Sequence, residues 1–252
     1  MSAAALIVLV IVVFLTTVIG VVTGSNSLIV VPVMFQVGIS PKVAVATNMF
    51  GLTFMAIGAT IPFVRQGRIE YRRISPLVVL TVISSAIGAA LVGWITDGGI
   101  KLIVSVAMIL VAVFTLLKRD KGVVKESAVS RAALVTTFIA TFLLGIYGGL
   151  YSGGYVTVLT AALVAFFGMT FSEAVASTKF INIFSSLVAT TVFAWQGLID
   201  YRLGLILAVT MFIGAYIGAH YAVKLNDLWL KRIFLATVFL LALKTICDFA
   251  AN

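Results

Sequence analysis

The sequence predicts an all-α membrane protein that crosses the bilayer several times. Hydrophobic residues make up 62% of the chain and charged residues only 10%, whereas soluble domains average about 25% charged residues. Apolar runs close to the ~20 residues that span the hydrocarbon core recur from end to end. Runs of this length favour helices over a β-barrel, whose strands would alternate in polarity over about 10 residues each.

Ten apolar segments follow one another along the chain, and all of them are expected to be helical. Two of them, 28–37 and 156–167, follow glycine-rich breaks and are too short to cross a bilayer at right angles. A charged connection, Lys118 to Arg131, separates the first five segments from the last five. The segments are 3–22, 28–37, 43–64, 76–96, 100–117, 132–147, 156–167, 174–195, 203–223 and 228–249.

The two halves read as copies of one unit. When Gly24 is placed on Gly154, the chain overlays on itself without a gap as far as about Leu116, and 27 of 93 pairs are identical. The loop RQGRIEYR at 65–72 falls on WQGLIDYR at 195–202, and shared apolar composition does not explain identities in a polar loop. We expect a single transmembrane domain, 1–252, with repeat one at about 1–117, the connection at 118–131 and repeat two at 132–252. Duplication is usual in secondary transporters.

The distribution of basic residues favours two inverted repeats, each with a glycine-broken short helix. Inversion places the loops 65–73, 118–131 and 224–232 on one side with twelve Lys or Arg, against three on the other side. Such a bias marks the cytoplasmic side, so both termini would lie outside. Parallel repeats would give a weaker bias of about ten against five, and this alternative stays open. Topology also explains most of the net charge of +9, so no nucleic-acid partner is expected.

The glycine-rich breaks, GVVTGSNS at 20–27 and GIYGGLYSGGY at 145–155, are the first candidate site. Within a membrane, non-helical backbone is tolerated only where it is buried in protein or lines a cavity. The short helices start directly after the breaks, and helix N-termini attract anions. We expect the breaks to meet near the middle of the bilayer and bind a small anion, although capping and close helix packing are an alternative. The candidate residues are Gly24, Ser25, Asn26, Ser27, Ser152, Gly153, Gly154 and Tyr155.

Lys179 is the second candidate feature, because it is a charge inside an apolar segment. A charge at that depth costs about 2.5–3.5 kcal/mol on insertion scales, so it tends to face a cavity or the bundle interior. The alternative is a lysine near the helix start that snorkels to the headgroups. Thr178 and Asn182 accompany it, and Asn48 lies in the corresponding helix of repeat one. The corresponding stripe in repeat one carries no charge, so the site would be asymmetric.

The sequence offers no basis for an enzyme. One histidine and one cysteine, Cys247, cannot build a metal cluster of the usual kind. No two acidic residues share a membrane segment at helical spacing, and neither a GxSxG motif nor a P-loop occurs. We therefore expect no catalytic residue, no metal and no cofactor.

The order of these motifs resembles the TauE/SafE family of sulfite and organosulfonate exporters. The resemblance rests on the breaks with their short apolar segments at 24–32 and 149–159, the helix starts at 44–48 and 174–179, and the Gln-Gly-x-Ile-Asp/Glu-Tyr-Arg loops. It covers nearly the whole chain and implies export of sulfur-containing anions such as sulfite, thiosulfate or sulfonates. The chain differs from the family in having Gly-Ser-Asn-Ser at 24–27 instead of a longer glycine run, and Lys179 instead of a small or hydroxyl residue.

The sequence thus predicts a multi-pass secondary transporter in the plasma (inner) membrane that exports a small sulfur-containing anion by alternating access. Its partners would be the anionic substrate and the lipid bilayer. A coupling proton or ion and a homodimer are left open. The alternatives are a passive anion channel and a membrane assembly partner that transports nothing.

Overall fold

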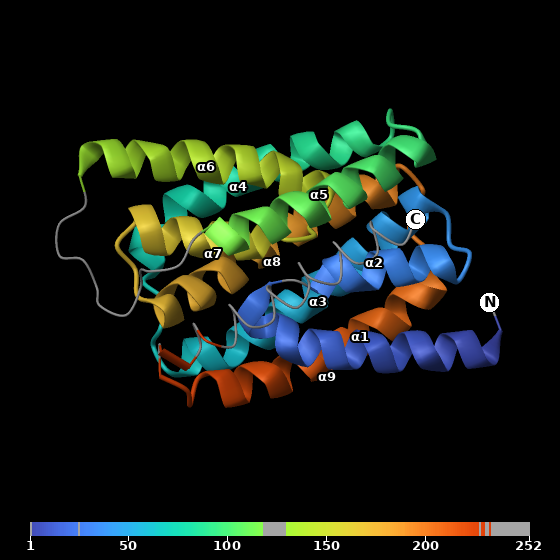
Figure 1. Ribbon diagram of the computed structural model, residues 1–252, viewed down its shortest axis with the longest axis horizontal. Helices are drawn as coiled ribbons and strands as arrows, with labels where there is room; N and C mark the ends of the chain where they lie inside the picture. Colours follow the sequence, from blue (N-terminus) through green and yellow to red (C-terminus); the bar gives the residue numbers. More distant parts are fainter. Residues whose placement is uncertain (1, 25, 118–129, 227, 230–231, 233–252) are drawn as a thin grey trace.

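The computed structural model describes residues 2–24, 26–117, 130–226, 228–229 and 232, and all regular structure in that part of the chain is helical (Figure 1). Six of the described helices are long and apolar enough to cross a membrane, which confirms the multi-pass all-α fold. They are α1 (Ala3–Thr23), α3 (Pro41–Arg65), α4 (Tyr71–Val92), α6 (Arg131–Leu150), α8 (Phe171–Trp195) and α9 (Tyr201–Ala222).

Two short helices, α2 (Asn26–Gln36) and α7 (Tyr155–Phe166), follow the glycine-rich breaks. They match the two short segments expected from the sequence. A further helix, α5 (Asp97–Leu117), ends the first half. Most of the expected segment 228–249, including Cys247, and nearly all of the charged connection lie outside the described residues.

The duplication extends to backbone conformation. In the overlay of the two halves, α8 begins and ends at the counterparts of the first and last residues of α3, and α9 does the same relative to α4. All six described glycines with positive φ fall into pairs in this overlay, and such angles favour glycine because they lie in the left-handed region. The pairs are Gly24 and Gly154, Gly38 and Gly168, and Gly67 and Gly197. The same turns therefore recur at the same places in both halves.

The helices of each half pack mainly on helices of the other half, so the two halves do not form separate bundles. Helix α1 of the first half packs on α9 of the second, and α6 of the second half packs on α4 of the first. The central pair, α3 and α8, contact each other, and each also packs on a helix of the other half. In Figure 1, α1 starts at the end of the molecule drawn on the right, whereas α6, its counterpart, starts at the end drawn on the left.

Glycines allow the paired helices to approach backbone to backbone. A Cβ atom added to Gly88 of α4 would lie 1.8 Å from the carbonyl oxygen of Ile146 in α6. A Cβ atom added to Gly218 of α9 would lie 2.3 Å from the carbonyl oxygen of Val18 in α1. Small residues drive helix packing in membranes by this close approach. Gly88 and Gly218 are counterparts in the overlay, so the same close backbone contact occurs in both halves.

We expect Gly88→Ala and Gly218→Ala each to destabilise the folded protein by about 1–3 kcal/mol, because the new methyl group must push two helices apart. The midpoint of thermal unfolding in detergent measures the effect. Gly98→Ala is the matched control, because a Cβ atom there would meet nothing nearer than 4.0 Å. Equal midpoints for Gly88→Ala and Gly98→Ala would contradict this account of the packing.

Candidate functional site

The two glycine-rich breaks lie against each other. A Cβ atom added to Gly24 in the first break would lie 2.8 Å from the backbone nitrogen of Thr157 in α7. The Thr157 hydroxyl donates a hydrogen bond of 2.6 Å to the carbonyl oxygen of Thr23. The Tyr151 hydroxyl, in the second break, donates one of 3.0 Å to the carbonyl oxygen of Ser27. The halves are thus joined directly where their helices are interrupted.

These contacts satisfy backbone groups that the interrupted helix α1 leaves open. The last carbonyls of a helix lack partners within the helix, and a buried acceptor without a partner costs about 1–3 kcal/mol. The carbonyl of Thr23 is satisfied by Thr157 of α7. The carbonyl of Gly20 accepts from the backbone N–H of Gly24 at 2.8 Å and from the Lys179 ammonium at 3.0 Å. The second half therefore completes the break in the first.

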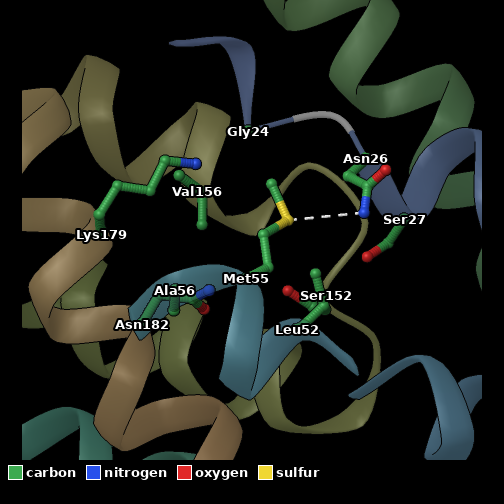
Figure 2. A pocket seen from close by; sticks show the side chains of 10 residues that line it. All are labelled: Gly24, Asn26, Ser27, Leu52, Met55, Ala56, Ser152, Val156, Lys179 and Asn182. Carbon is green, nitrogen blue, oxygen red and sulfur yellow. Dashed lines mark hydrogen bonds between the residues drawn. The ribbon is translucent and has the colours of Figure 1, made fainter. Parts of the chain in front are cut away.

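A small cavity lies beside the meeting point of the breaks (Figure 2). Its walls come from both breaks and from the two central helices, α3 and α8. The volume open to the centre of a water-sized sphere is about 10 Å³, which is room for about one water molecule. An anion with three or four oxygens would not fit without movement of the walls. The lining residues are Gly24, Asn26, Ser27, Leu52, Met55, Ala56, Ser152, Val156, Lys179 and Asn182.

Lys179 is the one ionisable side chain among these ten lining residues. Its side chain is 2% exposed and turns inward to the end of α1, so it does not reach toward the headgroups. Among the described residues, the recorded ion pair joins Arg73 to Glu70, and no carboxylate lies within ion-pair distance of Lys179. An ammonium has three N–H donors, and the bond to Gly20 uses one of them. A buried cation with two free donors and no carboxylate partner can bind an anion.

Two asparagines from the first half carry buried amide oxygens without a hydrogen-bond partner in the described part of the chain. The Asn26 amide donates to the sulfur of Met55 at 3.5 Å, which is a weak acceptor. The Asn48 amide donates to the Ser27 hydroxyl at 3.0 Å, so Asn48 lies behind the cavity and positions Ser27. Buried polar groups are normally paired, so the open acceptor of Asn26 leaves the cavity wall incompletely satisfied.

Half of the twelve candidate residues line the cavity, and five others, which the structure also describes, do not. Thr178 faces α7, where its hydroxyl lies 3.0 Å from that of Thr160. Gly153 accepts a hydrogen bond from the Tyr147 hydroxyl, and the Tyr155 ring packs on Gly148. Ser25 lies outside the described residues. The candidates that line the cavity are Gly24, Asn26, Ser27, Ser152, Lys179 and Asn182.

The sequence analysis missed four apolar lining residues, Leu52, Met55, Ala56 and Val156. Met55 is prominent among them, because its side chain lies between Lys179 and Asn26 (Figure 2). Three of the four follow Asn48 at spacings of four, seven and eight residues, which is one face of a helix. That periodicity was the signal that would have found them.

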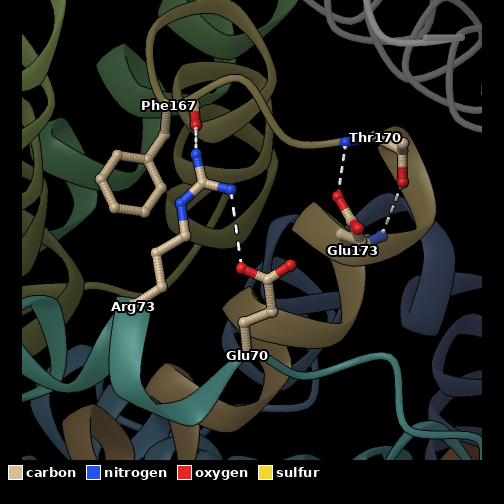
Figure 3. A network of polar contacts seen from close by, with 5 residues as sticks. All are labelled: Glu70, Arg73, Phe167, Thr170 and Glu173. Atoms are coloured by element: carbon tan, nitrogen blue, oxygen red, sulfur yellow. Dashed lines mark hydrogen bonds and ion pairs between the residues drawn. The ribbon is translucent and has the colours of Figure 1, made fainter. Parts of the chain in front are cut away.

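A second contact between the halves lies outside the cavity wall (Figure 3). Arg73, near the start of α4, donates a hydrogen bond to the carbonyl of Phe167 at the end of α7 and lies 4.6 Å from the centre of the Phe167 ring. Its guanidinium is 3.8 Å from the carboxylate of Glu70. Thr170 and Glu173 form a reciprocal cap at the start of α8. Arg73 thus ties the first half to the end of a short helix in the second.

The model of the family described as sulfite exporter TauE/SafE matches residues 9–245. The chain therefore belongs to the TauE/SafE family. No solved structure matches it.

Three curated relatives are named as membrane transporters. The probable membrane transporter protein ORF9 of Sinorhizobium sp is 26% identical over 231 residues, which cover 90% of this chain and 87% of the relative. A probable membrane transporter protein of Haemophilus influenzae is 23% identical over 93% of this chain and 92% of its own length. The probable membrane transporter protein YfcA of Escherichia coli K12 is 25% identical over 79% and 73%. The class defined by the fold and the family is a multi-pass membrane transporter.

We expect Thr157→Val to destabilise the protein by about 1–3 kcal/mol, because it removes the buried hydrogen bond that the Thr157 hydroxyl donates to the carbonyl of Thr23. The change keeps the shape of the side chain, and thermal unfolding in detergent measures it. Thr191→Val is the control, because the Thr191 hydroxyl is exposed and bonds within its own helix, to Leu187. If the two variants unfold at the same temperature, the contact between the breaks is not a stabilising one.

Proposed function

We propose that this chain is a secondary transporter that exports a small sulfur-containing anion, such as sulfite, thiosulfate or an organosulfonate, by alternating access across the plasma (inner) membrane. The observation that carries this proposal is the Lys179 ammonium, buried in the cavity between the breaks without a carboxylate partner among the described residues. The family name supports the sulfur anion, and buried charge in a transporter marks a substrate path.

The cavity wall supplies the donors that an oxyanion needs. Two N–H groups of Lys179 remain after its bond to Gly20. The hydroxyls of Ser27 and Ser152 and the amide of Asn182 belong to the same wall. Several donors can each take a separate oxygen, and bonds from a charged donor are the strongest of them. The starts of α2 and α7 add backbone N–H groups at the breaks.

The narrowness of the cavity favours a carrier over a passive channel. In the present conformation the cavity has room for about one water molecule, and its walls come from both halves. Movement of one half against the other would therefore widen it, as in transporters built from repeats. A channel would instead need a continuous path and would conduct without saturating.

Two features support inverted halves with a basic cytoplasmic side. The corresponding helices α1 and α6 start at opposite ends of the molecule (Figure 1). In addition, the overlay pairs the basic residue Arg65 with Trp195 and the basic residue Lys224 with Trp94. Trp195 is 85% exposed and Trp94 is 90% exposed. Inversion places both basic residues on one side, as the positive-inside rule predicts, and both tryptophans at the opposite interface.

We expect liposomes that contain the purified protein to take up a sulfur anion with saturable kinetics, and Lys179→Ala to reduce that uptake by at least about tenfold, because one ionic contact is worth more than about 1.4 kcal/mol. Sulfite, thiosulfate, sulfoacetate, sulfate and an amino acid are offered in turn, with and without a pH gradient. Lys42→Ala is the control, because the ammonium of the half-buried Lys42 lies outside the cavity and donates to the carbonyl of Gly93, in the loop after α4.

Each other result would replace part of the proposal. Equal losses in Lys179→Ala and Lys42→Ala would remove Lys179 from the substrate path. Uptake without saturation would favour the passive channel. Uptake of the amino acid alone would overturn the substrate class, and the absence of any flux would favour an assembly role without transport.

A further inference from the structure

Lys179 sets the formal charge of the cavity. The other nine lining residues are uncharged. The described parts of α1, α2 and α7 contain no Asp, Glu, Lys, Arg or His, and those of α3 and α9 carry theirs near the helix ends, at Lys42, Arg65, Arg202 and His220. In α8 the other charged residue is Glu173, which accepts from the backbone N–H of Thr170. The nearby phenols are neutral donors: Tyr151 donates to Ser27 and Tyr147 to Gly153.

The helix ends around the cavity largely offset one another. A helix N-terminus carries roughly half a positive elementary charge, and a C-terminus roughly half a negative one. The end of α1 and the start of α2 meet at the first break, and the end of α6 and the start of α7 meet at the second. Each break therefore brings together one end of each sign. What remains is the single charge that Lys179 carries in its ammonium form.

We infer that this cavity accepts monoanions and rejects dianions of the same size. A monoanion and the Lys179 ammonium form a neutral pair in the protein interior. A dianion leaves one negative charge buried without compensation, which is strongly unfavourable in apolar surroundings. The inference rests on the proposed function and narrows it. The substrates would be organosulfonates with one negative charge and bisulfite, rather than the sulfite dianion, sulfate or thiosulfate.

The chemistry of the wall fits a head of three oxygens with an apolar substituent. Four of the ten lining residues are apolar: Leu52, Met55, Ala56 and Val156. Their side chains offer no N–H or O–H donor to the fourth oxygen of a sulfate ion, but they can contact a methyl group. In Figure 2 the Met55 side chain lies in the middle of the site, where it would meet a bound molecule first. Its flexible thioether adapts its shape at low cost.

Methanesulfonate and sulfate are the matched probes. Both are tetrahedral sulfur anions of similar size. Methanesulfonate has a methyl group where sulfate has a fourth oxygen, and it carries one negative charge instead of two. Their binding to the full-length protein in detergent or lipid nanodiscs is measured by calorimetry at neutral pH, where the charge of each anion is fixed. We expect methanesulfonate to bind at least about tenfold more tightly than sulfate. Equal affinities, or tighter binding of sulfate, would overturn the inference.

A variant tests the charge balance itself. Asn182→Asp keeps the size of the side chain but places a carboxylate one helical turn from Lys179, so the cavity becomes neutral. We expect it to lose at least about tenfold in methanesulfonate affinity. The exposed Asn226→Asp adds the same charge elsewhere and should change nothing. Equal changes in methanesulfonate affinity for Asn182→Asp and Asn226→Asp would overturn the inference.

The outcomes also separate this inference from the proposed function. If sulfate or thiosulfate binds as tightly as methanesulfonate and Lys179→Met removes all binding, the site is an anion site but does not select by charge. In that case the inference fails and the proposed function stands. If no sulfur anion binds or moves, both fail. Binding of methanesulfonate alone, lost in Lys179→Met and Asn182→Asp, supports both.

Discussion

The structure depends on one constraint: an interrupted helix in an apolar environment must find hydrogen-bond partners for its free backbone groups. Helix α1 ends in the glycine-rich break, and the carbonyls of its last turn receive the Thr157 hydroxyl and the Lys179 ammonium. Both donors come from the second half of the chain. The need to satisfy the first break therefore holds the halves together and, at the same place, buries a cation whose remaining donors are free.

The helices and their duplication were predictable because they follow from local composition. The length of the apolar runs predicted the spanning helices, and the glycine-rich stretches predicted the breaks. For example, α3 (Pro41–Arg65) closely matches the expected segment 43–64. The overlay of the two halves predicted which helices correspond, and the glycines with positive φ form pairs in the same register. Lys179 was also predictable as a site residue, because a charged side chain within an apolar segment is costly and therefore tends to be functional.

The internal arrangement of the site was less predictable, because it depends on how each helix is turned about its axis. Thr178 and Lys179 are neighbours in sequence, yet Thr178 faces Thr160 while Lys179 faces the cavity. Asn48 supports Ser27 from behind instead of lining the space. Met55 was not predicted as a site residue, because one apolar residue in an apolar helix does not stand out in the sequence. Spacing identifies a face of a helix, but only packing decides what that face contacts.

The Arg73 contact gives the two ends of the molecule unequal mechanical properties. Arg73 binds the carbonyl of Phe167 across the boundary between the halves, but its counterpart in the second half is Leu203, which has no such donor. Separation of the halves at the Arg73 end must break a hydrogen bond from a charged guanidinium. At the other end the bonds between the halves come from neutral donors, the backbone N–H of Asp200 to the Thr47 hydroxyl and the Gln196 amide to the carbonyls of Ala89 and Ala90. If the halves move against each other as proposed, opening the Arg73 end would cost a charged hydrogen bond and opening the other end only neutral ones.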